Sequence, residues 1–250
     1  MHFERFQNDF GHLSGFTIPE SMCVWDFLLE FQSKTWQPAS LLEIGVYHGQ
    51  SAMMLALHCK AEETILLIDP SDYVEEARKV LSRFDGAKFE IIKVRSSDSA
   101  SWALTSRYRH ALRWVHIDGD HKAQAVWNDL LLANDLLADT GIICVDDFFN
   151  PGYPQLTYTV CRFLEQNHSQ LQLFLCGYNK GYLARPGAMQ KYLEAIRQDL
   201  ARAITTCGFT DFTIFKTDYP NVVNAFGVVK GRWGDFEYYG LDEDPKKIPY

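Results

Sequence analysis

Acidic side chains gather at two places where an apolar run of the sequence stops. Residues 114–117 (Trp-Val-His-Ile) lead directly into Asp118-Gly-Asp-His121, and residues 142–145 (Ile-Ile-Cys-Val) lead into Asp146-Asp147. Short apolar runs rich in β-branched residues predict buried strands. Because neighbouring strands of a parallel sheet end at the same edge, we expect these carboxylates to share one crevice.

Three of these acids, Asp118, Asp146 and Asp147, are candidate ligands of a magnesium ion. Magnesium prefers oxygen donors in near-octahedral geometry and keeps some of its waters. Without compensation, clustered carboxylates would repel one another and raise the pKa of one of them. Either a cation or several Lys and Arg partners must therefore be present, and Lys122 is the only cation close in sequence. Alternatively, Asp118 caps the following helix and Asp146 and Asp147 are solvated loop acids.

His121, three residues after Asp118, is the candidate general base. Imidazole titrates near neutrality, and a bound cation lowers the pKa of a hydroxyl held on it. The hydroxyl proton could pass to His121 or to Asp118 itself. The alternative is a first-turn histidine that donates to the backbone or to Asp118. His116 is expected to point the other way along its strand, as a satisfied core histidine.

A glycine motif, Glu43-Ile-Gly45-Val-Tyr-His-Gly49-Gln-Ser51, lies between a predicted strand and a predicted helix. It departs from the G-x-G-x-x-G spacing that binds a dinucleotide pyrophosphate, because Tyr47 takes the middle glycine place and Glu43 adds negative charge. An acid here suits a ligand with ammonium and sulfonium charge, and Asp69, at the end of the next strand, suits a ribose diol. Both features fit S-adenosylmethionine. Alternatively, the glycines only make a tight turn.

Predicted strands and helices alternate strictly up to residue 167. Five strands with intervening helices predict a doubly wound parallel α/β sheet with right-handed crossovers. The strands are expected at 41–44, 64–68, 89–94, 112–117 and 142–145, and the helices at 22–31, 51–59, 73–84, 99–106, 122–137 and 155–166. Thr17 is the expected cap of the first helix. Strands at 171–176 and 182–184 flank Asn179-Lys180-Gly181 and predict an antiparallel edge hairpin.

We therefore expect a Rossmann-like, mostly parallel seven-stranded sheet within a domain over residues 1–187, followed by a C-terminal extension over 188–250. The extension is expected to contain a helix over 189–206 and a second hairpin from strands 212–216 and 222–229. Four aromatic residues follow it: Trp233, Phe236, Tyr238 and Tyr239. Because aromatics seldom cluster in a free tail, we expect the extension to cover the active-site mouth or to bury against a second subunit in a homo-oligomer.

Composition excludes several classes of partner. The net charge of the 250 residues is -8, without a Lys/Arg stripe, so we expect no binding to nucleic acid. No uncharged run approaches the roughly 20 apolar residues of a membrane span, and no export signal is visible. The six cysteines are scattered without a CxxC pair, which favours reduced, buried thiols over disulfides or zinc. We expect a cytoplasmic protein.

The motifs together resemble the class I S-adenosylmethionine-dependent methyltransferases, in particular the metal-dependent O-methyltransferases that act on the macrolide sugars of macrocin and mycinamicin. The resemblance spans residues 19–184 and rests on Leu-Glu-Ile-Gly-Val-Tyr-His-Gly-Gln-Ser at 42–51, Val-His-Ile-Asp-Gly-Asp-His at 115–121 and Gly-Ile-Ile-Cys-Val-Asp-Asp at 141–147. Arg95-Ser96 departs from the Gly-Asp of many relatives, and the region after Met189 has no counterpart.

The resemblance implies roles for individual residues of this chain. Glu43, Gly45 and Gly49 would line the methionine part of the cofactor, Asp69 would hold the ribose, and Ser97 or Asp98 would lie near the adenine. Ser51 would also contact the cofactor. Asp118, Asp146 and Asp147 would bind magnesium, and His121 matches the base of some relatives. The expected activity is methyl transfer to a hydroxyl of a small polyhydroxylated acceptor, a sugar or a natural product. A nicotinamide-dependent oxidoreductase and an inactive methyltransferase-like binding protein are the alternatives.

Overall fold

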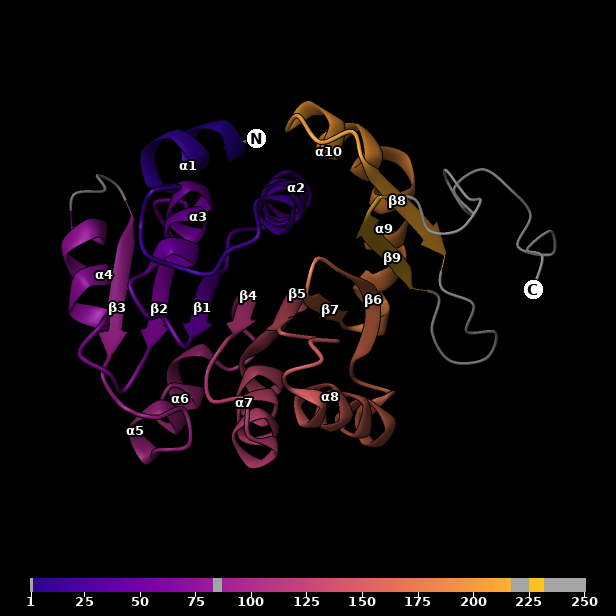
Figure 1. Ribbon diagram of the computed structural model, residues 1–250. Coiled ribbons are helices and arrows are strands. Elements are labelled where there is room, and N and C mark those ends of the chain that lie inside the picture. Colours follow the sequence, from indigo (N-terminus) through magenta and orange to yellow (C-terminus); the bar gives the residue numbers. More distant parts are fainter. Residues whose placement is uncertain (1, 83–86, 217–224, 232–250) are drawn as a thin grey trace.

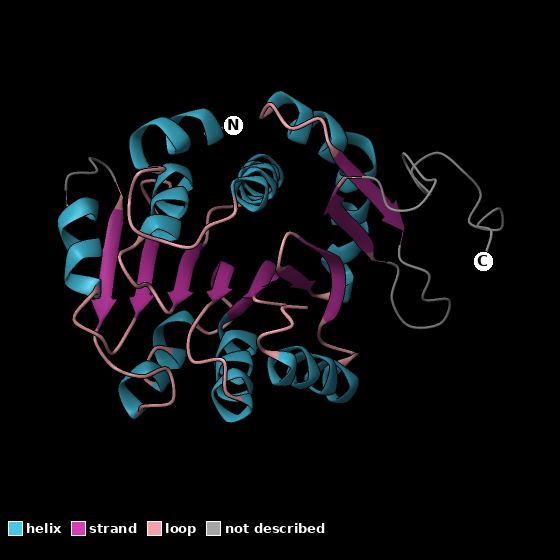
Figure 2. Cartoon of the chain, viewed as in Figure 1, coloured by secondary structure: helices cyan, strands magenta, loops and turns pink. Residues whose placement is uncertain are grey.

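A single mixed sheet forms the centre of the protein in the computed structural model, which describes residues 2–82, 87–216 and 225–231. Nine strands follow the order β3-β2-β1-β4-β5-β7-β6-β9-β8 (Figures 1 and 2). Among the described strands, β7 and β8 run against all the others. The strands are β1 (Ser40–Ile44), β2 (Thr64–Ile68), β3 (Lys88–Ile92), β4 (Leu112–Ile117), β5 (Leu137–Asp146), β6 (Gln172–Gly177), β7 (Lys180–Ala184), β8 (Phe212–Lys216) and β9 (Phe226–Lys230).

Helices cover both faces of this sheet (Figure 2). One face carries α1 (Phe3–Phe10), α2 (Pro19–Thr35), α3 (Gln50–His58), α4 (Val74–Leu81), α9 (Pro186–Ala195), the π-helical turn η1 (Ile196–Leu200) and α10 (Ala201–Thr206). The opposite face carries α5 (Ser99–Trp102), α6 (Thr105–Tyr108), α7 (Ala123–Leu136) and α8 (Pro154–Asn167). Two hydrophobic cores result, one on each side of the sheet. Burial on both faces explains why the central strands are nearly continuous apolar runs.

The candidate site lies where the direction of winding reverses. From β1 the chain moves outward through β2 and β3, and then returns to place β4 on the other side of β1. Ligands of open α/β sheets bind beyond the carboxyl ends of the strands at such a switch point. The two strands here pair in parallel with Glu43 beside His116, so the glycine motif and the acids after β4 leave the sheet side by side.

The predicted alternation of strands and helices is confirmed, with three differences. Helix α1 was not predicted. The expected number of seven strands was too low, because β9 pairs with β6 and β8 pairs with β9, so that both join the sheet. Thr17 is not the cap of α2: Ile18 holds that position, and the Thr17 hydroxyl donates to Gln50 instead. The turn of the second hairpin and the aromatic residues 233–239 lie outside the described residues.

The described part of the C-terminal region continues the same architecture. Helix α10 packs on α2, and Cys23 of α2 forms a disulfide with Cys207. The expectation of reduced cysteines throughout was therefore wrong for this pair, because 184 residues separate partners whose Cα atoms lie 6.4 Å apart only in the folded chain. Cys59, Cys144, Cys161 and Cys176 are free. Within the described ranges, every helix falls short of the length and apolar character that crossing a membrane requires.

Candidate active site

A buried chain of hydrogen bonds links the glycine motif to β4. Glu43 Oε1 accepts from Ser51 Oγ at 2.5 Å and lies 2.7 Å from His116 Nδ1. Glu43 is 0% and His116 1% exposed, so neither group is solvated. Because Nδ1–H of His116 donates to Glu43, the other ring nitrogen, Nε2, faces Asp146 Oδ2 at 3.8 Å. His116 therefore points into the candidate site, and the expectation that it points away was wrong.

Asp146 lies between two basic groups at the end of β5. Lys180 is its partner in the antiparallel β5–β7 register, and Nζ of Lys180 donates to Asp146 Oδ2. Burial alone would raise the pKa of Asp146, but Lys180 and His116 hold it well below its usual range. Burial alone would lower the pKa of His116, but Asp146 and Glu43 raise it to about 9. The carboxylate, the imidazolium and the ammonium therefore form one charged group near neutral pH.

His121 joins the other two acids. Its Nε2 lies 3.1 Å from Asp147 Oδ2 and 3.6 Å from Asp118 Oδ1, and its ring stacks on Tyr153 with centroids 4.2 Å apart. Contact with Asp118 raises the pKa of His121. Loss of water in the crevice, together with the charge of Asp146, raises the pKa of Asp118 to about 6. Asp118 and His121 thus each bind a proton more tightly than the isolated side chains do.

The donor atoms fit a divalent cation at two of the three predicted acids. Single donor atoms of His116, Asp118 and Asp146 lie within 4.8 Å of one another. Nε2 of His116 has no hydrogen-bond partner among the described residues, and it could join such a ligand set only after losing the proton that it carries near neutral pH. Asp147 is engaged differently: Oδ1 accepts from Asn150 and Asn179, and Oδ2 faces His121. A cation bound to Asp118 and Asp147 together would have to displace the imidazole between them.

A cavity of about 600 Å³ opens beside these acids, at the carboxyl ends of the central strands. Three predicted cofactor residues line it, Gly45, Asp69 and Ser97, and Asp118 lines it as well. Pockets of this size hold small-molecule ligands and cofactors. The cavity also contains Arg95 and Ser96, the pair that departs from the resemblance.

The Asp69 carboxylate binds the backbone of the glycine turn. Its Oδ2 accepts from the backbone amides of Val46 and Tyr47 at 2.8 and 2.9 Å, and its Oδ1 accepts from the amide and the hydroxyl of Ser71. Four donors fill the acceptor capacity of a carboxylate. Asp69 therefore holds the turn in place, and a ribose hydroxyl would reach its carboxylate by replacing the Ser71 hydroxyl.

The two glycines of the motif are required for different reasons. Gly45 has φ +83°, and a Cβ there would lie 1.9 Å from the carbonyl oxygen of Asp118. Gly49 also has φ +83°, and a Cβ there would meet the Ala77 side chain of α4 at 2.6 Å. Gly45 thus permits the close approach of the turns after β1 and β4, whereas Gly49 permits packing between helices.

The remaining predicted cofactor residues lie elsewhere. Ser51 lines a smaller cavity of about 50 Å³. Glu43 is buried beneath the glycine turn, and Gly49 packs against α4. Asp98 is the N-cap residue of α5, where its carboxylate accepts from the Arg95 amide. Of the predicted cofactor residues, Gly45, Asp69 and Ser97 can therefore contact a ligand in the large cavity directly.

The small cavity adjoins the large one at Tyr47 and Asp118, which line both. Its other walls come from the segment before α2, residues 14–17, and from His116, Asp146 and Lys180. A ligand in the large cavity and a ligand in the small cavity would thus both lie next to Asp118. Such an arrangement suits transfer of a group between two bound molecules.

The sequence analysis did not assign two residues of this centre, His116 and Lys180, to the candidate site. His116 carried a usable signal, because residues two apart on a strand face the same side and Asp118 follows it by two. Lys180 carried none, because its place beside Asp146 depends on the register between β5 and β7.

Part of this chain matches a known protein family. Residues 42–148 match the family model described as "Methyltransferase domain". An uncharacterized protein, R132, of Acanthamoeba polyphaga mimivirus is 29% identical over 128 residues, which cover 48% of this chain and 58% of that protein. The chain thus spans little more than half the length of this relative.

Solved structures share the fold. CalS11, a TDP-rhamnose 3'-O-methyltransferase of calicheamicin biosynthesis, is 16% identical with a TM-score of 0.53, covering 74% of this chain and 93% of its own. The O-methyltransferase NovP is 16% identical with a TM-score of 0.56, covering 67% and 80%. An O-methyltransferase of Bacillus cereus in complex with SAH is 15% identical with a TM-score of 0.53, covering 72% and 88%. This shared fold confirms the predicted Rossmann-like sheet.

Proposed function

We propose that this chain, whose residues 42–148 match the model of a methyltransferase domain, moves a methyl group from S-adenosylmethionine to a hydroxyl of a small polyhydroxylated acceptor. The observation that carries the proposal is that Asp118 and Tyr47 line both cavities. The cofactor would occupy the large cavity with its sulfonium toward Asp118, and the acceptor would approach from the small one. Asp118, which lines both cavities, makes this region suitable for a cationic methyl donor.

In the proposed reaction, a lone pair of the acceptor oxygen attacks the methyl carbon in line with the breaking carbon–sulfur bond, and S-adenosylhomocysteine leaves. The hydroxyl proton passes to His121 or to Asp118, which are 3.6 Å apart and share raised pKa values. Tyr153 holds the imidazole by stacking, so that its Nε2 stays directed at the acids. Orientation of the two reactants and stabilisation of the developing alkoxide would supply most of the rate.

Asp118 and Asp146 would hold a magnesium ion, with Asp147 as the third acid at the same strand ends. When bound, magnesium supplies positive charge beside the acceptor oxygens. Lys180 supplies a fixed charge of the same sign from β7, and its ammonium already neutralises Asp146. Lys180 stabilises the folded arrangement of these acids, and it limits how strongly Asp146 attracts a cation.

The decisive experiment uses the purified full chain. Mass spectrometry should detect S-adenosylhomocysteine or S-adenosylmethionine carried through purification, and either one should raise the melting temperature. Stabilisation by NAD instead would support an oxidoreductase. Methylation should then be assayed against nucleotide sugars and glycosylated natural products, because CalS11 is a TDP-rhamnose O-methyltransferase. Absence of S-adenosylhomocysteine binding would reject the proposal.

A further inference from the structure

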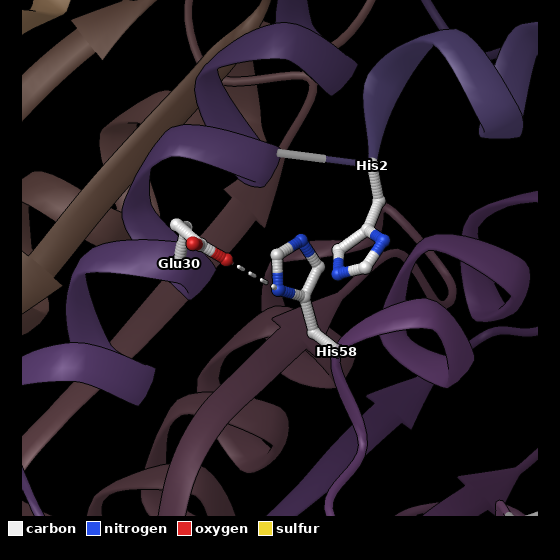
Figure 3. A group of neighbouring side chains, drawn as sticks. All are labelled: His2, Glu30 and His58. Atoms are coloured by element: carbon white, nitrogen blue, oxygen red, sulfur yellow. Dashed lines mark ion pairs between the residues drawn. The ribbon is translucent and has the colours of Figure 1, made fainter.

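A second group of metal-ligating side chains lies on the face of the sheet that carries α1, α2 and α3. Figure 3 shows His2, Glu30 and His58 turned toward one another from the start of α1, the middle of α2 and the end of α3. One donor atom from each lies within 4.8 Å of the others. These residues are separate from the cavities at the strand ends, whose linings do not include them.

The buried residue Asp26 orients the imidazole of His58. Asp26 Oδ1 lies 2.8 Å from His58 Nε2, and neither side chain is more than 1% exposed. Because Nε2–H donates to this carboxylate, the lone pair of the ring lies on Nδ1, which faces Glu30 Oε2. A carboxylate that accepts from the far nitrogen of a histidine is the usual support of a metal-bound imidazole.

The spacing of the three donors leaves room for an ion. Glu30 Oε2 and His58 Nδ1 are 4.0 Å apart, which is too long for a hydrogen bond. Two ligands at about 2.0–2.1 Å from a tetrahedral zinc ion lie roughly 3.3 Å apart, so a small inward movement of Glu30 would close the site. The His2 ring stands edge-on to the His58 ring with centroids 4.7 Å apart, and it supplies the third donor of the group.

We infer that His2, Glu30 and His58 bind one divalent ion of the zinc class, with Asp26 supporting His58. Two imidazoles and one carboxylate are donors that zinc accepts, and three protein ligands leave the fourth position for water. Both His2 and Glu30 are partly exposed, so an ion can enter from solvent.

Bound zinc would join α1 to α2 and α3. Asp26 already fastens the start of α1, because its carboxylate accepts from the backbone amides of His2 and Phe3. The segment that follows α1 includes residues 14–17, which line the small cavity at the candidate active site. Zinc would therefore stabilise α1, the helix that precedes residues 14–17.

The test is calorimetric titration of the tag-free, EDTA-treated full chain with zinc chloride. It is carried out in an Asp118→Asn/Asp146→Asn background, which removes the two acids proposed to hold a cation in the active site. We expect one zinc ion per chain and a higher melting temperature in its presence. His2→Ala and Glu30→Gln should each weaken this binding at least tenfold. His2→Ala leaves the backbone contact with Asp26 in place, and Glu30→Gln preserves the side-chain shape, so both variants should fold.

His12→Ala is the matched control, because this exposed histidine follows α1 without belonging to the cluster. It should bind zinc as tightly as the parent does. Cobalt provides a second readout, since a four-coordinate nitrogen and oxygen site gives visible absorption bands that should disappear in His2→Ala. Absence of zinc binding in the parent, or unchanged binding in both His2→Ala and Glu30→Gln, would overturn the inference.

Discussion

Lys180 donates to Asp146 across the antiparallel β5–β7 pair, and both side chains are nearly buried. The contact places a fixed positive charge beside the acids that follow β4 and β5. This charge compensates the negative charge of the acidic cluster. Without it, the clustered carboxylates would ionise less readily. Removing the lysine should therefore affect both stability and cation binding.

Lys180→Met should destabilise the protein by about 3 kcal/mol, since it leaves the Asp146 carboxylate buried without its main partner. Magnesium should raise the melting temperature of this variant more than that of the wild type, because the cation then replaces the lost charge. Lys122→Met is the control: Lys122 pairs with the exposed Asp120, so little change is expected. Equal stability of wild type and Lys180→Met would refute this account of the pair.

Proposed magnesium binding predicts a separation of turnover from cofactor affinity. Once an acceptor is identified, EDTA should stop methylation and magnesium should restore it. Asp146→Asn should lose turnover but keep its affinity for S-adenosylhomocysteine, because Asp146 lines the small cavity and not the large one. Calorimetry and a methylation assay measure the two quantities. Full activity in EDTA would show that the reaction needs no metal ion.

His121→Ala should lower kcat by roughly 10²- to 10⁴-fold, the usual contribution of a general base. Affinity for S-adenosylhomocysteine should stay the same, since His121 does not line the large cavity. Tyr153→Phe keeps the aromatic ring that stacks on His121 and should retain most of the activity. Unchanged kcat in His121→Ala would leave Asp118 as the proton acceptor.

Asp69→Asn should weaken binding of S-adenosylhomocysteine by about 1.5 to 3 kcal/mol, because one amide oxygen cannot replace two carboxylate oxygens. The loss combines any direct contact with a ribose and the loosened turn at Val46 and Tyr47. Asp72→Asn serves as the control, since Asp72 is exposed and pairs with Lys93. Unchanged affinity in the Asp69 variant, measured by calorimetry, would contradict the assignment.

Asp129 offers a test of stability against pH. Burial raises its pKa to about 6, and its Oδ1 has no partner among the described residues. Because the folded pKa lies above the unfolded value near 4, its stabilising effect is complete below about pH 4 and is lost as pH rises through 6. Asp129→Asn should therefore be more stable than wild type at pH 7.5, by about 1 to 3 kcal/mol, and the difference should vanish at pH 4. Thermal unfolding at both pH values measures it.

The sequence by itself determined the parallel part of the sheet and the residues that end its strands. Apolar runs that stop at Glu43-Ile-Gly45, Asp69 and Asp118 are local signals, because a buried strand needs apolar side chains and its end releases that requirement. The sequence therefore predicted that Asp118 and Asp146 lie together at one edge of the sheet, and the structure places them there. Residue Gly45 was found as well, although its reason, the nearby carbonyl of Asp118, was not.

Only the tertiary structure decided what compensates the acids. Lys180 reaches Asp146 through the register of β7 on β5, and Cys23 reaches Cys207 through the packing of α10 on α2. The ninth strand pairs with β6 in the same way, across a long stretch of sequence. Such contacts join residues far apart in the chain, so no local pattern of residue types encodes them. They are fixed by the burial of apolar faces in the folded protein, where the positions of all the elements are chosen together.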